Sequence, residues 1–135
     1  MVKRLNTWPK LLSEYMQGRQ NMPFAWGSND CMAFVAYAVE ALTGEQLFAE
    51  YGGYTDEAEA NAMLEANGGI EGILTVVLGQ PSTRGMMAKR GDVVLLNLPN
   101  PTAGIVDDTG QRIALVSKSG LLRCKLEKAK LSWSY

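Results

Sequence analysis

The sequence predicts an α+β fold in which N-terminal helices pack on a small C-terminal antiparallel sheet. Apolar residues recur at helical spacing through residues 1–83, whereas short apolar runs between turn residues dominate residues 84–135. The chain has 135 residues, 47% of them hydrophobic, which suits one folded globular domain. We therefore expect a single domain over 1–135, mainly helical over 1–83 and mainly stranded over 84–135.

Two helices are expected in the first third of the chain. Thr7 is a suitable cap for the first helix, and Gly18 follows its end. The second helix is expected to begin where Asn29 or Asp30 can accept orphan amide hydrogens, and to stop at Gly44. Its apolar stripe at helical spacing consists of Cys31, Phe34, Val35, Ala38, Val39 and Leu42.

Two further helices are expected before the strands begin. Thr55 is expected to cap a third helix, which carries acidic residues near its positive end and stops at 67–69. A short fourth helix is expected over 70–78, followed by a loop over 79–91.

Short strands are expected to fill the rest of the chain. Residues 91–96 open a strand whose continuous apolar run, Val93 to Leu96, predicts burial on both faces. The turn residues at 107–110 predict a hairpin, and their composition fits a turn better than a calcium loop. The other strands are expected at 104–106, 113–116, 121–126 and 131–135.

The charges are unevenly placed along the chain. The net charge is +3 over residues 1–19, −9 over residues 20–83 and +5 over residues 84–135. This pattern fits two solvated faces, or a module that docks between neighbours of opposite charge. The basic residues are scattered and accompany no recognised motif, so we do not expect nucleic acid as a partner.

Several classes of site are excluded by composition. The chain contains no histidine, which excludes Ser-His-Asp and Cys-His catalysis and the usual zinc hydrolase sites. Two cysteines cannot build a disulfide framework or a structural zinc site. We expect no cofactor and no metal. The sequence shows no membrane span and no secretion signal, so we expect the protein in the cytoplasm of the cell that makes it.

Cys31 is the candidate nucleophile. It lies in the first turn of the second helix, where the helix dipole favours a thiolate. It also lies on the apolar stripe, so a buried structural role is the alternative. A thiolate needs a general base, and the adjacent Asp30 would raise the pKa of the thiol rather than lower it. The other cysteine, Cys124, is expected to face the core while Arg123 and Lys125 face water.

Four aromatic residues flank the start of the second helix. Phe24, Trp26, Tyr51 and Tyr54 could line a groove for a peptide or a sugar. The alternative is a small core beneath the helix start, because large aromatic side chains are usually buried.

Several short motifs together resemble the NlpC-type papain-like cysteine peptidases. The resemblance rests on Pro23-Phe24-Ala25-Trp26-Gly27, Asp30-Cys31 with Phe34-Val35, Gly91-Asp92-Val93-Val94, and Gly104-Ile105. The whole chain is also similar to short uncharacterised proteins of tailed phages and prophages. The motifs shared with those proteins are Trp8-Pro9, Trp26 to Cys31, Thr43-Gly44, Gly91 to Val94, and Trp133.

The resemblance implies a papain-like α+β domain with Cys31 at the nucleophile position. Thr102 then stands where the peptidases carry their histidine, and Ala114 falls near their third polar residue. Phe24 replaces a tyrosine whose hydroxyl lies near the peptidase active site. Met32 and Ala33 replace the serine and glycine that follow the nucleophile. These changes retain the fold and remove the usual peptidase chemistry.

Three functions are compatible with the sequence. The first is a non-catalytic structural or assembly module of a phage or prophage, associated with the tail. The second is a cysteine hydrolase acting on peptidoglycan stem peptides or a phage protein. The third is a small phage protein that inhibits a host factor. The expected partners are phage tail or host proteins, or peptidoglycan, and the expected location is the bacterial host cytoplasm or the virion tail. The candidate binding residues are Phe24, Trp26, Asp30 and Thr102.

Overall fold

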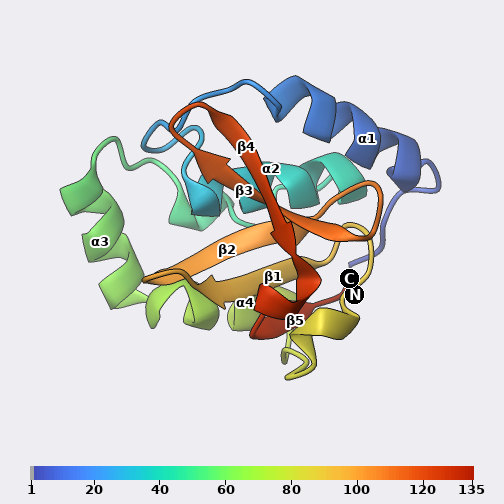
Figure 1. The fold of residues 1–135 in the computed structure, drawn as a ribbon. Coiled ribbons are helices and arrows are strands. Elements are labelled where there is room, and N and C mark those ends of the chain that lie inside the picture. Colours follow the sequence, from blue (N-terminus) through green and yellow to red (C-terminus); the bar gives the residue numbers. More distant parts are fainter. Residues whose placement is uncertain (1) are drawn as a thin grey trace.

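The computed structural model describes residues 2–135 and shows an α+β fold, as expected (Figure 1). The α-helices are α1 (Trp8–Arg19), α2 (Cys31–Thr43), α3 (Glu57–Ala66) and α4 (Gly69–Leu78). The strands are β1 (Val93–Asn97), β2 (Pro101–Val106), β3 (Arg112–Ser117), β4 (Gly120–Lys125) and β5 (Leu131–Trp133). Short 3-10 helices are η1 (Ala49–Tyr51), η2 (Gly85–Met87) and η3 (Leu126–Lys128).

The five strands form one antiparallel sheet with the order β4-β3-β2-β1-β5. Strand β1 lies between β2 and the chain's final strand, so Val93 is paired with both Ile105 and Trp133. The hairpin predicted around residues 107–110 is confirmed, because β2 and β3 pair on either side of it. Antiparallel neighbours need only short connections, which suits the short turns of this region.

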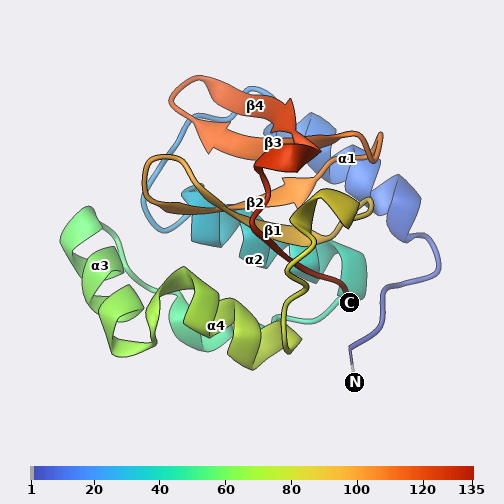
Figure 2. The same cartoon turned by 60° about the horizontal axis from the view of Figure 1, so that its bottom comes forward.

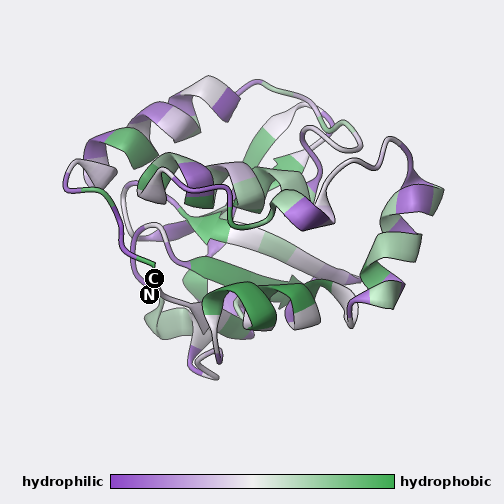
Figure 3. Cartoon of the chain, turned by 180° about the vertical axis from the view of Figure 1, so that it is seen from behind, coloured by the Kyte–Doolittle hydropathy of each residue, from purple (hydrophilic) through white to green (hydrophobic). Residues whose placement is uncertain are grey.

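Helices α2 and α4 lie on one face of the sheet (Figures 1 and 2). The two helices cover strands that carry mostly hydrophobic residues (Figure 3). The apolar stripe of α2 packs into the main core together with Val93, Leu95 and Ile105, as the helical spacing predicts. The side chains of this stripe that are fully buried are Phe34, Val35, Ala38, Val39 and Leu42.

Strand β1 is buried on both faces, which confirms the prediction from its continuous apolar run. Side chains alternate across a strand, so Val93 and Leu95 join the main core while Val94 and Leu96 face the other way. The second face is covered by Ala88 and the region around η3. Residues 79–91, expected to form a plain loop, therefore include η2 and supply part of this second core. Cys124 packs against the second core as well.

Two helix caps differ from the sequence prediction. Thr7 occupies the cap position of α1, but its side chain caps no amide of the described residues. Asp56, rather than Thr55, caps α3 by accepting a hydrogen bond from the Glu59 N–H. Thr55 does not cap the helix because its hydroxyl and its N–H both donate to the Glu59 carboxylate. The result is a reciprocal capping arrangement that begins one residue later than expected.

A buried carboxylate joins the two ends of the chain. Asp92 is 3% exposed, and it accepts hydrogen bonds from the Arg4 guanidinium at 2.9 Å and from the Ser134 hydroxyl at 2.9 Å. The Arg4 guanidinium also lies 4.4 Å from the ring of Trp8 and 4.5 Å from the ring of Tyr135. Cation–π contacts of this kind stabilise a guanidinium that has lost much of its water.

The core assignment predicts the effect of Phe34→Ala. Phe34 is fully buried and lies 5.5 Å from the Tyr15 ring, so its truncation should lower the free energy of unfolding by ~3–5 kcal/mol. Chemical denaturation followed by circular dichroism measures this change. Val76→Ala is the control, because Val76 is 74% exposed on α4 and its truncation should change the free energy by less than about 0.5 kcal/mol. Similar effects of the two substitutions would contradict the assignment.

Candidate functional site

Cys31 is the first residue of α2, as predicted, and is partly exposed. Burial raises the pKa of its thiol, and the neighbouring Asp30 carboxylate raises it as well. The N–H of Ala103 on β2 forms a hydrogen bond to the sulfur, and this contact acts in the opposite direction without reversing the shift. The two roles predicted for Cys31 are a nucleophile and a buried structural residue. The raised pKa favours the structural role, because the thiol then stays protonated at neutral pH.

The strand beside Cys31 presents aliphatic side chains to it. Ala103 is fully buried in the main core with α2, so the adjacent Thr102 points to the opposite face of the sheet. The Thr102 hydroxyl donates to the carbonyl of Asn100, which satisfies it within its own turn. Thr102 therefore does not occupy the position of a base facing Cys31. Successive side chains alternate across a strand, so Thr102, although it stands at the position that the resemblance implies, lies on the face of β2 away from α2.

Ala114 lies on the same face of the sheet as Ala103. It pairs with Ile105 across β2 and β3 and is fully buried in the main core. Of the two strand positions that the resemblance assigns to polar catalytic groups, Thr102 therefore faces away from α2, and Ala114 faces the main core with a methyl group. Methyl groups can neither accept a proton from the thiol nor orient a base.

Asp30 is a structural residue in this fold. Its carboxylate is 3% exposed and accepts hydrogen bonds from the N–H groups of Gly27 and Ala33 and from the Tyr54 hydroxyl, at 2.7, 2.9 and 2.7 Å. It caps α2 and holds the preceding loop and Tyr54 together. Burial, followed by the hydrogen bond to Asp30, raises the pKa of Tyr54 well above its ordinary value. Asp30 is therefore fully engaged, which leaves it unsuited to serve as a base for Cys31.

The loop before α2 is held by the side chain of Asn29. Its amide donates to the carbonyls of Met22 and Pro23, and its carbonyl oxygen accepts from the Arg19 guanidinium at 2.7 Å. Gly27 has φ +83°, and a Cβ there would collide with the backbone carbonyl of residue 54. The loop is consequently fixed at both ends, and a glycine is required at position 27.

The four predicted aromatic residues separate into two groups. Tyr54 is buried and Tyr51 is half-buried, whereas Phe24 and Trp26 are 37% and 39% exposed. The rings of Phe24 and Trp26 meet edge to face with centroids 4.8 Å apart. The interpretation as a small core is therefore wrong for Phe24 and Trp26. They form an exposed aromatic pair on a rigid loop.

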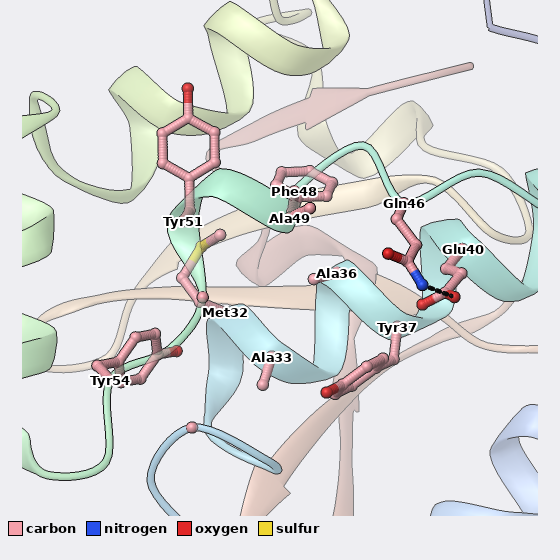
Figure 4. A pocket seen from close by; sticks show the side chains of 12 residues that line it. Met32, Ala33, Ala36, Tyr37, Glu40, Gln46, Phe48, Ala49, Tyr51 and Tyr54 are labelled. Atoms are coloured by element: carbon pink, nitrogen blue, oxygen red, sulfur yellow. Dashed lines mark hydrogen bonds between the residues drawn. The ribbon is translucent and has the colours of Figure 1, made fainter.

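A groove lies along the outer face of α2, on the side away from the sheet (Figure 4). It has a volume of about 260 Å³. Gly27, which belongs to the loop that carries the aromatic pair, is one of its lining residues. Ala33, which is buried, and Ala36, which is half-buried, lie on α2 between the walls. The walls are formed by Met32, Tyr37, Glu40, Phe48, Tyr51 and Tyr54.

Two of the tyrosines in the groove, Tyr51 and Tyr54, could be predicted from the sequence, but the groove itself could not. Ala33, Ala36, Tyr37 and Glu40 recur at helical spacing on α2, and this pattern was available in the sequence. The opposite wall comes from the segment around η1, and its approach to α2 depends on tertiary packing. The structure does not bring Thr102 to the groove, and Cys31 is not among its lining residues.

Two further properties concern the whole described chain. Within residues 2–135, no group of three or more Cys, Asp or Glu side chains is placed to hold a metal ion. Over the same residues, no helix has the length and apolar character needed to cross a membrane.

A family of known sequences matches almost the whole chain. Residues 3–135 match the family described as "Domain of unknown function (DUF6950)". No curated protein sequence matches the chain. The family description specifies no activity, substrate or partner.

The buried tyrosines predict how stability depends on alkaline pH. Burial raises the pKa of Tyr15, Tyr54 and Tyr135 well above the ordinary value of about 10. In the unfolded chain these hydroxyls ionise near pH 10, so unfolding above that pH releases protons. Their contribution is therefore complete below about pH 10 and is lost as the pH rises further, at up to ~1.4 kcal/mol per pH unit for each tyrosine.

Denaturant titrations at several alkaline pH values measure this slope. Tyr54→Phe removes one ionising group and should make the loss of stability with pH less steep by about one tyrosine's share. An identical slope in the wild type and in Tyr54→Phe would show that Tyr54 ionises freely in the folded protein.

Proposed function

The chain belongs to the family described as domain of unknown function DUF6950, and we propose that it is a non-catalytic binding module. In this proposal its fold is a degenerate NlpC-type papain-like domain. The module serves as a structural or assembly component of a tailed phage or prophage, in or near the tail, and acts in the host cytoplasm or within the virion. Its partners are then phage tail proteins or host proteins.

The environment of the Cys31 thiol carries the proposal. A cysteine nucleophile needs a base within hydrogen-bond reach and a group that orients this base. Here Ala103 and Ala114 contribute methyl groups to the main core against which Cys31 packs. The Asp30 carboxylate already accepts three hydrogen bonds. Together with the lack of histidine in the sequence, this leaves Cys31 without acid–base partners.

The resemblance to phage and prophage proteins supports the finer part of the proposal, and the roles of the shared residues agree with it. Trp8 stacks on Arg4, Gly44 ends α2 in a left-handed conformation, and Trp133 is buried beside β1. Asp30 and Asp92 are buried hydrogen-bond acceptors. These shared residues maintain the fold rather than a reaction, which fits a family that uses the fold as a scaffold.

A cysteine hydrolase that acts on peptidoglycan stem peptides or a phage protein is the second candidate. The observation in its favour is that Cys31 is partly exposed at a helix N-terminus, next to the backbone donor of Ala103. It would require a base supplied by a partner or by the substrate.

Alkylation distinguishes the two candidates. In a Cys124→Ser background Cys31 is the remaining thiol, and its raised pKa predicts slow reaction with iodoacetamide at neutral pH. The rate in the folded protein should be at least about ten-fold below the rate of the same variant in urea, and it should increase only at alkaline pH. Mass spectrometry quantifies the adduct. A folded-state rate above the urea rate at pH 7 would contradict the binding-module proposal.

Cys31→Ala provides the functional test. It removes a small partly buried side chain, so it should lower the free energy of unfolding by about 1 kcal/mol or less. Phage production and the set of proteins co-purified from infected or lysogenic cells should stay unchanged. Cys31→Ser is the matched polar control. Loss of titre in Cys31→Ala with an unchanged melt and unchanged co-purification would favour the hydrolase.

A further inference from the structure

We infer that the groove along α2 binds a cationic side chain, preferably an arginine, from an extended segment of a partner protein. The inference rests on the proposed function and deepens it, because it names the surface of the module and the chemistry of its partner. The observations that carry it are the groove's size, its aromatic walls, its carboxylate and the charge of the surrounding chain.

The size of the groove selects one long side chain. Pockets that hold drug-sized ligands measure roughly 300–1,000 Å³. The groove is about 260 Å³ and open along its length, so it suits a single extended side chain laid along α2. The methyl groups of Ala33 and Ala36 leave room over the helix for an aliphatic stem (Figure 4).

The aromatic walls favour a guanidinium. Tyr37 is 43% exposed, and its ring already lies 5.2 Å from the guanidinium of Arg19. Arg19 is fixed in that position by the carbonyl of Ser28 and the side chain of Asn29. The chain therefore shows that this tyrosine accepts a guanidinium, and the half-buried Tyr51 offers further aromatic surface along the groove.

Glu40 supplies the charge at one end of the groove. One of its carboxylate oxygens accepts a hydrogen bond from the Gln46 side chain at 3.2 Å, which fixes its orientation (Figure 4). The ion pairs formed within residues 2–135 are Arg4–Asp92, Arg123–Asp107 and Lys125–Glu127, so none of them neutralises Glu40. A carboxylate held in this way is available to a cation that enters along the helix.

The charge of the surrounding chain selects the sign of the partner. All groove residues fall within residues 20–83, which contain nine acidic and no basic side chains. Glu45 and Glu50 are exposed in the segment that forms the second wall. Arg19 also reaches this region, where its guanidinium lies against Tyr37 and is held by Asn29. The acidic side chains around the groove favour a basic segment over an anionic ligand.

A peptide titration tests the inference. The probe is the acetylated and amidated pentapeptide Ala-Leu-Arg-Leu-Ala, and the matched probe has glutamine in place of arginine. Adding the arginine peptide to ¹⁵N-labelled protein should shift the amide signals of Ala33, Ala36, Tyr37, Glu40 and Phe48. The glutamine peptide should bind at least about five-fold more weakly.

Glu40→Gln removes the charge and keeps a polar group of the same size next to Gln46. It should weaken binding of the arginine peptide about five-fold and reduce the dependence on salt. Glu65→Gln makes the same change of charge at an exposed position on α3 and should leave binding unchanged. Equal binding of the two peptides, or equal effects of the two substitutions, would overturn the inference.

Two further measurements separate this inference from self-association and from the proposed function. If the free protein self-associates in sedimentation and the groove amides shift with protein concentration alone, a second copy occupies the groove and the inference is overturned. Cys31→Ala should bind the arginine peptide like the wild type, because Cys31 does not line the groove. If the arginine peptide does not bind and Cys31 is unreactive towards iodoacetamide, the groove is not the binding surface, and the binding-module proposal stands. If Cys31 reacts rapidly in the folded protein, the binding-module proposal is contradicted instead.

Discussion

The buried carboxylate of Asp30 is the constraint on which the candidate site depends. One side chain caps α2, fixes the turn at Gly27 and holds the hydroxyl of Tyr54. These three contacts set the start of the central helix, the exposed aromatic loop before it and one wall of the groove. A buried charge is retained only when its oxygens are satisfied, so the three segments must assemble together. The site is thus a property of the fold rather than of any single loop.

Most of the fold could be predicted from the sequence because local patterns dominate it. The helical spacing of α2 and the continuous apolar run of β1 each identified an element together with the faces that it buries. Thr7 occupies the predicted cap position of α1, whereas the cap of α3 lies one residue later than predicted because neighbouring polar residues compete for the same amides. At Thr55 and Asp56, the choice depends on where the Glu59 side chain binds. That contact is not encoded in the type of either residue.

The candidate site was less predictable, for a different reason. Cys31 and Asp30 could be placed at the start of the helix, but their function depends on which residue of β2 faces them. Thr102 and Ala103 are adjacent in the sequence and lie on opposite faces of the sheet. The face that each residue takes therefore decides whether a hydroxyl or a methyl group lies on the side of α2. The groove depends on the approach of the η1 segment to α2, which no periodicity in the sequence describes.

The separation of charge along the chain also affects how quickly a partner is found. The acidic segment forms α2, α3, α4 and both walls of the groove, whereas most basic residues lie in the first turns of the chain and in the sheet region. If the groove binds a basic segment as proposed, the acidic side chains around it steer that segment before contact. The association rate constant should therefore fall as salt is added, while the dissociation rate constant changes much less.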